Sequence, residues 1–373
     1  MPDLWSPLDV GRLRLHHRLA LSPMMRNRAH PDGSPTALDA EYFAQRASLG
    51  LLITGGTQPS ADGQGFLLSH GCYTDEHVAG WRRVTQAAHD SGGHLFVQLM
   101  HAGRVAHPAN TPHGRRPVAP SAVAAGVGIH TPHGNRPVPI PRELSTTEVR
   151  ATVGDFRRAA AAAIEAGADG VEIHAANGFL LQQFLSANAN HRTDAYGGSI
   201  TNRTRFALEV VEAVAGEIGA DRTAVRISPG LRGFGINEGA TGPATYRHLV
   251  RKLAGLAFLH VTHHGDDALA AELRSAWSGP LLLTRPGSTV EERAADVTSG
   301  LADLVTLGIL ALANPDVVDR LRAGAGFTSP DPATFYGGGA EGYTDYPTLT
   351  GEKRSLPPEH DFRDAVDQTT SVK

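Results

Sequence analysis

The stretch with the most chemical content runs from Val171 to Val210 and reads VEIHAANGFLLQQFLSANANHRTDAYGGSITNRTRFALEV. It begins as a short apolar strand and passes into a polar turn that carries His174 and Asn177. At a strand end, this spacing places two hydrogen-bond donors over one point, where they would stabilise the oxygen of a developing enolate. The pattern predicts a site at this turn. The alternative is that both side chains only satisfy a polar turn.

Arg226 is the second residue that indicates a ligand, because it lies in TAVRISPG, an otherwise apolar strand-like segment. A cation in such a place is costly unless an anion or an acid meets it. Arg226 therefore indicates an anionic ligand, with an internal salt bridge as the alternative. Gln98, in FVQLMH, and Gly56 also fall at the ends of predicted strands.

The elements that must position these residues are short apolar segments of β type, separated by helix-like stretches rich in alanine and leucine. The segments are Leu19–Ser22, Leu51–Thr54, His94–Leu99, Gly170–His174, Thr223–Ser228, Ala257–Thr262, Pro280–Thr284 and Asp303–Leu307. The clearest helices are Asp75–Asp90, Thr146–Ala166 and Thr201–Ile218. Eight strands that alternate with helices predict an α/β fold of the (β/α)8 TIM-barrel type, with the site at the C-terminal ends of the strands.

At these motifs the chain resembles the old yellow enzyme family, the FMN-dependent alkene reductases on a TIM barrel. That family reads His-x-x-Asn (or His)-Gly-Tyr at the turn and then RTDxYGGSxxNRxRFxLEV, which residues 192–210 match at nearly every fixed position. Residues 335–347, FYGGGAEGYTDYP, closely resemble its C-terminal signature. The resemblance implies an oxidoreductase that binds FMN, uses NADPH or NADH as reductant and acts on a carbonyl-conjugated alkene.

The resemblance also implies a role for individual residues. The two donors of the turn would hold the carbonyl oxygen of the substrate while the flavin delivers hydride to the β-carbon. Arg226 would neutralise the anionic edge of reduced flavin, and Gln98 would hydrogen-bond its pyrimidine side. Pro23 and Gly56 match backbone positions that lie against the ring.

Several pocket positions depart from the family pattern. Phe179 stands where the family has its proton-donating tyrosine, Met25 replaces a threonine near the flavin, and Met100 replaces a bulky tryptophan. We expect these three residues and Tyr336 to line the substrate pocket. A positioned general acid contributes ~10² to 10⁴ in rate, so alkene reduction should be slow unless Tyr336 or another donor replaces the tyrosine.

The phosphate-binding positions depart as well. The loop that usually reads Gly-x-Gly is Thr284-Arg285-Pro286-Gly287, and proline has no N–H to offer a phosphate. The Gly-Arg pair of the next strand is Gly308-Ile309, so the arginine that binds the phosphate is missing. We expect Arg285 and Gly308 to line what remains of this site, and we expect FMN to bind weakly there or not at all.

Three functions remain open on the sequence. The first is an FMN-dependent oxidoreductase whose poor proton delivery allows isomerisation in place of net reduction. The second is a flavin-free isomerase or cyclase that polarises a carbonyl with His174 and Asn177. The third is a binding protein without catalysis, because fold alone does not imply function.

Composition excludes several other classes. Lys plus Arg is 34 and Asp plus Glu is 38, so a net charge of −4 gives no reason to expect nucleic acid or an anionic membrane as partner. The single cysteine excludes an internal disulfide, and no apolar stretch approaches the ~18 residues of a membrane span. We expect a cytoplasmic enzyme for a small-molecule substrate, either a monomer or a homo-oligomer.

We expect one barrel domain over residues 1–350 and a C-terminal tail over 351–373. An insertion over about 101–143 contains two near copies, TPHGRRPV at 111–118 and TPHGNRPV at 131–138. Each reads as a tight turn leading into a strand, which predicts a β-hairpin or lid after the third barrel strand. Five histidines crowd the insertion, but their spacing is unlike a zinc site, so we expect no metal.

Overall fold

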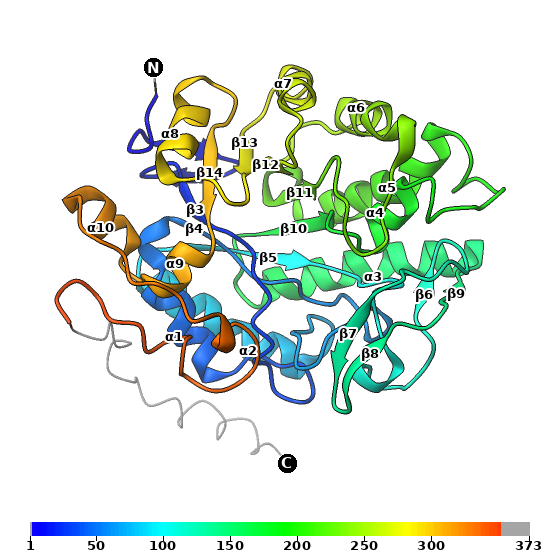
Figure 1. Cartoon of the computed structure of the whole chain (residues 1–373), viewed down its shortest axis with the longest axis horizontal. Helices are drawn as coiled ribbons and strands as arrows, with labels where there is room; N and C mark the ends of the chain where they lie inside the picture. The colour runs from blue at the N-terminus through cyan, green and yellow to red at the C-terminus, as the bar shows by residue number, and fades with distance from the viewer. Residues whose placement is uncertain (1, 352–373) are drawn as a thin grey trace, which may run out of the picture.

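The structure is a computed structural model, and it describes residues 2–351. Eight parallel strands close into a barrel in the order β10-β11-β12-β13-β14-β3-β4-β5, with helices around it (Figure 1). The barrel strands are β3 (Leu19–Leu21), β4 (Leu51–Ile53), β5 (His94–Leu99), β10 (Gly170–Ala175), β11 (Thr223–Ile227), β12 (Phe258–Thr262), β13 (Leu281–Thr284) and β14 (Leu304–Leu307). The predicted (β/α)8 barrel is confirmed, and each strand end lies within one residue of its predicted position.

The helices follow the strands. They are α1 (Ala37–Gln45), α2 (Asp75–Asp90), α3 (Thr146–Glu165), α4 (Leu180–Leu185), α5 (Ile200–Ile218), α6 (Gly242–Lys252), α7 (Asp267–Ala276), α8 (Val290–Thr298), α9 (Ile309–Ala313) and α10 (Val317–Ala323). Side chains fix where several of them begin. In α3, Ser145 accepts from the backbone N–H of Glu148, whose carboxylate accepts from the N–H of Ser145.

The amino end of the barrel is closed by an N-terminal hairpin. Strands β1 (Leu8–Val10) and β2 (Leu13–Leu15) pair antiparallel, and their Val10 and Leu15 belong to one buried cluster with Phe96 and Phe258 from inside the barrel. This end is packed with apolar side chains. The opposite end, where the strands finish, is therefore the end that is left for chemistry.

Toward the C-terminal ends of the strands, polar side chains replace apolar ones inside the barrel. A chain of hydrogen bonds crosses its interior: Gln98 Nε2 donates to Glu172 Oε1 at 2.6 Å, and Glu172 Oε2 lies 2.7 Å from His260 Nδ1. His260 Nε2 lies 2.6 Å from the hydroxyl of Thr284, which lies 2.7 Å from that of Thr306. All five residues are buried. The chain thus joins strands β5, β10, β12, β13 and β14 beneath the site.

The segment after β5 contains the predicted hairpin. Strands β7 (Gly128–Thr131) and β8 (Gly134–Pro137) pair antiparallel and carry most of the second TPHGxRPV copy, while the first copy leads into β6 (Val118–Ala119). Strand β6 pairs with β9 (Arg142–Glu143). That the hairpin acts as a lid stays a prediction.

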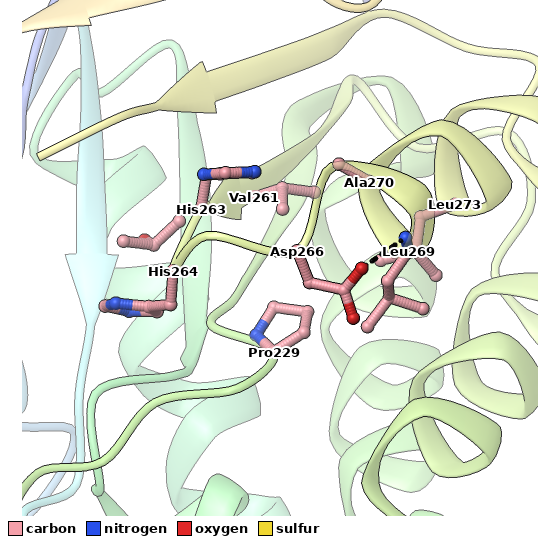
Figure 2. Close-up of a pocket in the computed structure, with 9 residues that line it drawn as sticks. Pro229, Val261, His263, His264, Asp266, Leu269, Ala270 and Leu273 are labelled. Atoms are coloured by element: carbon pink, nitrogen blue, oxygen red, sulfur yellow. Dashed lines mark hydrogen bonds between the residues drawn. The ribbon is translucent and has the colours of Figure 1, made fainter. Parts of the chain in front are cut away.

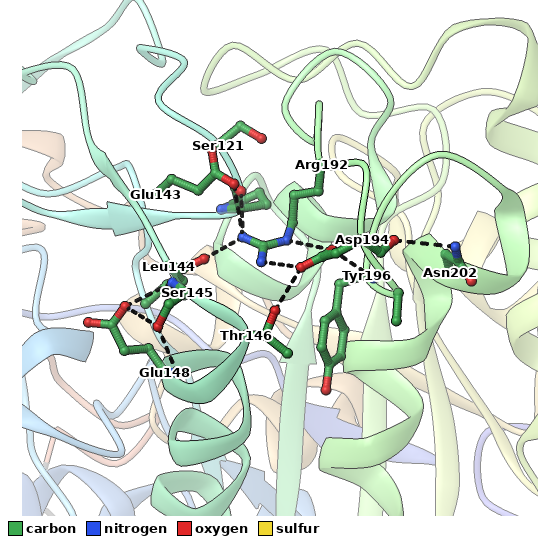
Figure 3. A network of polar contacts seen from close by, with 12 residues as sticks. Ser121, Glu143, Leu144, Ser145, Thr146, Glu148, Arg192, Asp194, Tyr196 and Asn202 are labelled. Carbon is green, nitrogen blue, oxygen red and sulfur yellow. Dashed lines mark hydrogen bonds and ion pairs between the residues drawn. The ribbon is translucent and has the colours of Figure 1, made fainter.

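Arg192 ties this insertion to the barrel (Figure 3). Its guanidinium donates to the backbone oxygens of Pro120 and Leu144 and forms an ion pair with Asp194. Asp194 also accepts from Thr146 at the start of α3. The RTDxYGG motif that carries the family resemblance therefore has a scaffolding role here, because it anchors the insertion beside α3.

The C-terminal segment folds back along α1, as the orange and blue ribbons show (Figure 1). The fully buried Arg46 donates to the backbone oxygens of Leu312 and Tyr343, and the hydroxyl of Tyr343 donates to Asp39. The predicted tail lies, apart from Gly351, outside the described residues. Over residues 2–351, no helix combines the length and the apolar character needed to cross a membrane.

Candidate functional site

The two predicted donors meet at the end of β10. His174 is the penultimate residue of the strand, and the following turn brings Asn177 Nδ2 to 3.5 Å from His174 Nε2. Asn177 has a positive φ of 54°, a left-handed conformation that asparagine tolerates better than most residues. The structure thus brings both side chains to one point.

The hydrogen bonds of His174 define which nitrogen is the donor. Burial lowers the pKa of His174 well below its usual value, with Arg226 and His260 acting in the same direction, so the ring is neutral. Its Nδ1 accepts from the backbone N–H of Ala176 at 3.2 Å. The single ring hydrogen must then lie on Nε2, the nitrogen next to Asn177. The pair therefore presents two N–H donors to a ligand oxygen.

Arg226 is a buried cation with a largely unpaired guanidinium. Its side chain is inside the barrel on β11, beside His174 on β10, and its Nε donates to Thr262 Oγ1 at 3.1 Å. Over residues 2–351, its terminal nitrogens have no hydrogen-bond or ion-pair partner. Burial lowers the pKa of Arg226, against the effect of Glu172, which raises it. A buried cation in this state fits the anionic edge of a flavin ring, the role that the resemblance implies.

Glu172 supplies the balancing charge beneath Arg226. Burial acts to raise the pKa of Glu172, but His260 and Arg226 outweigh that effect, and the pKa lies below its usual value. Burial lowers the pKa of His260. We infer an ionised Glu172 and a neutral His260 that donates to it. Because Glu172 takes an N–H of Gln98, the amide oxygen of Gln98 remains available to a ligand N–H.

Three of the four predicted pocket residues come together in one apolar cluster. Phe179 and Met100 are buried in it, and Met25 packs against them. The ring of Phe179 lies 5.2 Å from that of His174 and 5.7 Å from that of Phe234. The cluster also includes Phe66 and residues of the β7–β8 hairpin. Phe179 is therefore surrounded by aromatic and apolar groups beside the donor pair.

Tyr336 does not join this cluster. Its side chain is 69% exposed, and over residues 2–351 it has no hydrogen bond or ring contact. The backbone N–H of the next residue, Gly337, donates to the backbone oxygen of Arg26 on the loop after β3. The segment therefore reaches the end of the barrel where the strands finish, which is the end that carries the site. Its use as a proton donor stays a prediction that the geometry does not support.

The backbone positions predicted to lie against a flavin ring are close together. At Gly55 an added Cβ would lie 2.5 Å from the backbone oxygen of Met24, so the ends of β3 and β4 approach closely beside Pro23. At Gly56 it would lie 2.4 Å from the sulfur of Met100. The two glycines, together with Arg226 and Gln98, fit the ring of FMN. Gly308, which was predicted to line the phosphate site, lies near Met24 and Ser22.

The phosphate end does not fit in the same way. Arg285 forms ion pairs with Asp296 at 2.9 Å and Asp267 at 3.3 Å, so its charge is already met by two carboxylates. Its pKa is raised, first by the hydrogen bond to Asp296. Ile309 is apolar and 51% exposed. The two ion pairs of Arg285 therefore compete with any contact between its guanidinium and a phosphate.

Two histidines follow β12 near this end. His263 lies 2.9 Å from Asp267 and 3.2 Å from Arg285, and Figure 2 shows His264 beside it with Asp266 across a small pocket. The pocket lies between the end of β12 and α7. It does not include the donor pair. Over the described residues, no group of three or more His, Cys, Asp or Glu side chains is placed to hold a metal ion.

Sequence reasoning missed several residues around the site. Phe66 and Phe234 lie on loops, and their contact with Phe179 depends on loop conformations that no local pattern indicates. Glu172 and His260 did carry a signal, because each is a charged or titratable residue at an inward position of an apolar strand. The cost argument used for Arg226 would have found both.

Comparison with known proteins identifies the fold and the family. The family model described as NADH:flavin oxidoreductase / NADH oxidase matches residues 3–326. A probable flavin mononucleotide-dependent alkene reductase of Leishmania infantum is 43% identical, over 92% of this chain and 97% of that protein. 12-Oxophytodienoate reductase 7 of Oryza sativa subsp. japonica is 41% identical, over 94% and 96%.

A solved structure agrees with this relationship. Morphinone reductase in complex with tetrahydroNAD superposes with a TM-score of 0.89 at 40% identity, over 94% of this chain and 98% of that one. The barrel, the position of the donor pair at its open end and these near full-length matches agree. The chain belongs to the NADH:flavin oxidoreductase / NADH oxidase family, the old yellow enzyme family, and is an ene-reductase-like oxidoreductase.

Proposed function

We propose that the chain is an FMN-dependent oxidoreductase acting on a carbonyl-conjugated alkene, with proton delivery weak enough for isomerisation to replace part of net reduction. The observation that carries this proposal is the convergence of two N–H donors, His174 Nε2 and Asn177 Nδ2, beside the buried cation Arg226. The names of the alkene reductase and the 12-oxophytodienoate reductase among its relatives support the substrate class.

The two donors bind the substrate through its carbonyl oxygen. FMN held at Arg226 and Gln98 would, once reduced by NADPH or NADH, supply a hydride to the β-carbon of the alkene. Negative charge would then gather on the carbonyl oxygen, next to both donors. His174 is neutral, so it acts there as a hydrogen-bond donor and not as a cation. Donors aimed at such an oxygen in a site that excludes water stabilise the enolate strongly.

The second half of the reaction lacks an evident acid. Phe179 has no proton to give, and the aromatic rings around it, Phe66 and Phe234, have none either. The enolate therefore persists until solvent supplies a proton. With protonation slow, FMN held at Arg226 and Gln98 would be able to take the hydride back after bond rotation, which would leave an isomerised alkene.

A flavin-free isomerase or cyclase is the second candidate, and the phosphate end favours it. The ion pairs of Arg285 and the apolar Ile309 replace contacts that would hold a phosphate. Donor polarisation of a carbonyl needs no flavin. The absorbance of the purified protein separates the candidates, because the first requires a yellow protein that bleaches with NADPH or NADH.

The donor pair itself is tested by substitution. We expect His174→Ala and Asn177→Ala each to weaken binding of a phenol by ~10² to 10³, since one oxyanion donor contributes about 2.7–4 kcal/mol. Calorimetric titration with 4-nitrophenol measures this. The control is His16→Ala, an exposed histidine that follows the N-terminal hairpin. Unchanged affinity in both variants would remove the pair from the site.

A further inference from the structure

The turn that carries Asn177 is held from outside the barrel by a second buried network. The backbone N–H of Asn177 donates to Ser228 Oγ at 2.8 Å, and the N–H of Gly178 donates to Gln182 Oε1 at 2.7 Å. Ser228 Oγ donates to the same Gln182 oxygen at 3.1 Å. Gln182 and Ser228 are fully buried. The backbone N–H groups of Asn177 and Gly178 thus donate to two side chains, Ser228 and Gln182, that are hydrogen-bonded to each other.

This arrangement matters because Asn177 has a strained backbone. Its φ of 54° lies in the left-handed region, which costs free energy unless the surroundings hold it. Ser228 follows directly on the strand that carries Arg226. The hydroxyl of Ser228 therefore fixes the Asn177 side chain relative to both His174 and the buried cation.

The network continues into the loop after β11. Gln182 Nε2 donates to Glu238 Oε1 at 2.8 Å and to the hydroxyl of Tyr246 at 2.8 Å, and Glu238 Oε2 accepts from the N–H of Gly230 at 2.9 Å. The same loop places Phe234 against the turn, because a Cβ added at Gly178 would lie 2.7 Å from that of Phe234. The side-chain amide of Gln182 thus connects the turn that carries Asn177 to the loop after β11, which packs over that turn.

We propose that Ser228 and Gln182 are positioning residues that set the distance between the His174 and Asn177 donors and so determine how strongly a carbonyl or phenolate oxygen is bound. The proposal rests on the proposed function of the donor pair. Neither residue touches the ligand. Their effect passes through the backbone of Asn177 and Gly178.

Ser228→Ala is the sharpest test, since it removes one oxygen atom and leaves the Asn177 N–H without its acceptor. We expect binding of 4-nitrophenol to weaken about tenfold. Binding of 4-nitrotoluene, which has a methyl group in place of the phenolic hydroxyl, should stay unchanged. The pKa of bound 4-nitrophenol, read from its absorbance, should rise toward its value in water. Ser228→Thr, which retains the hydroxyl, should restore both. Ser186→Ala is the matched control, because it removes another buried hydroxyl, one that donates to the backbone oxygen of Gln182.

The outcomes separate this inference from the proposed function. Equal losses for both ligands, or for Ser186→Ala, would show a structural role and overturn the positioning role. Wild-type affinity for 4-nitrophenol in Ser228→Ala would overturn it as well. Failure of the wild-type protein to bind 4-nitrophenol would overturn the donor assignment itself. If Ser228→Ala does not fold, Gln182→Met, which removes the acceptor of the Gly178 N–H at a similar side-chain length, is titrated with the same two ligands, and equal losses would again count against positioning.

Discussion

On the proposed mechanism, Phe179 would decide the fate of the enolate, because a phenylalanine in an aromatic cluster has no proton to donate. We expect Phe179→Tyr to speed reduction of 2-cyclohexenone by ~10² to 10⁴, the contribution of a positioned general acid. The measurement is anaerobic NADPH oxidation with product analysis. Phe234→Tyr adds a hydroxyl to a neighbouring ring and serves as control. A flavin-loaded Phe179→Tyr variant that is no faster than wild type would contradict the proton-donor argument.

Ile309 allows a test by gain of function, because an arginine at this position would lie where the resemblance implies a contact to the FMN phosphate. We propose that flavin is held more by its ring than by its phosphate, so riboflavin should bind nearly as well as FMN. Ile309→Arg restores the missing cation and should strengthen FMN binding about ten- to a hundredfold, with riboflavin unchanged. Titration of both flavins into apo-protein measures this. Ile140→Arg, at another exposed isoleucine, controls for net charge. Equal gains for both flavins would count against a phosphate contact.

At the scale of elements, Asp194 links the insertion to α3 and gives stability a pH dependence. Its hydrogen bond to Arg192 lowers the pKa of Asp194 to about 2, below the ~3.9 of an unfolded aspartate. The folded-state pKa is depressed, so this stabilisation is present above about pH 4 and is lost as pH falls toward 2. Because a third of the Asp194 side chain is exposed, solvent screening reduces its size.

Asp194→Asn should therefore lower the melting temperature at pH 7, and its difference from wild type should shrink between pH 4 and pH 2. Thermal unfolding across this pH range measures the difference. Asp9→Asn, at an exposed ion pair of the N-terminal hairpin, is the control. A difference that is the same at both ends of the range would mean that the Asp194 charge does not contribute.

The predictability of the elements had a physical basis. The barrel strands are buried on both faces and read as continuous apolar runs, and three long helices carry clear caps, so both were predicted from the sequence. The short helix α4 was missed because Leu180–Leu185 is buried on every side and is too short to show a helical period. The donor pair and Arg226 were predicted from their residue types and from the family resemblance, whereas Phe66 and Phe234 lie on loops whose conformation no local pattern indicates.

At the scale of the whole molecule, the C-terminal segment is held to α1 by buried polar contacts. The Tyr343 hydroxyl donates to Asp39 Oδ1 at 2.8 Å, and Asp39 is fully buried. Tyr343→Phe should lower the free energy of unfolding by about 1–3 kcal/mol, the cost of an unmade hydrogen bond to a buried group. Denaturant unfolding measures this, with Tyr336→Phe, at an exposed ring, as control. A stability equal to wild type would show that the contact is not formed.

The hydroxyl of Thr284 has a consequence for any redesign of the loop that follows β13. It completes the hydrogen bonding of the buried His260 inside the barrel and also lies 2.7 Å from the hydroxyl of Thr306. A glycine at this position would leave a buried nitrogen of the His260 ring without its partner. A glycine-rich loop that begins at residue 284 therefore requires a compensating substitution at His260, so the loop and the barrel interior have to be redesigned together.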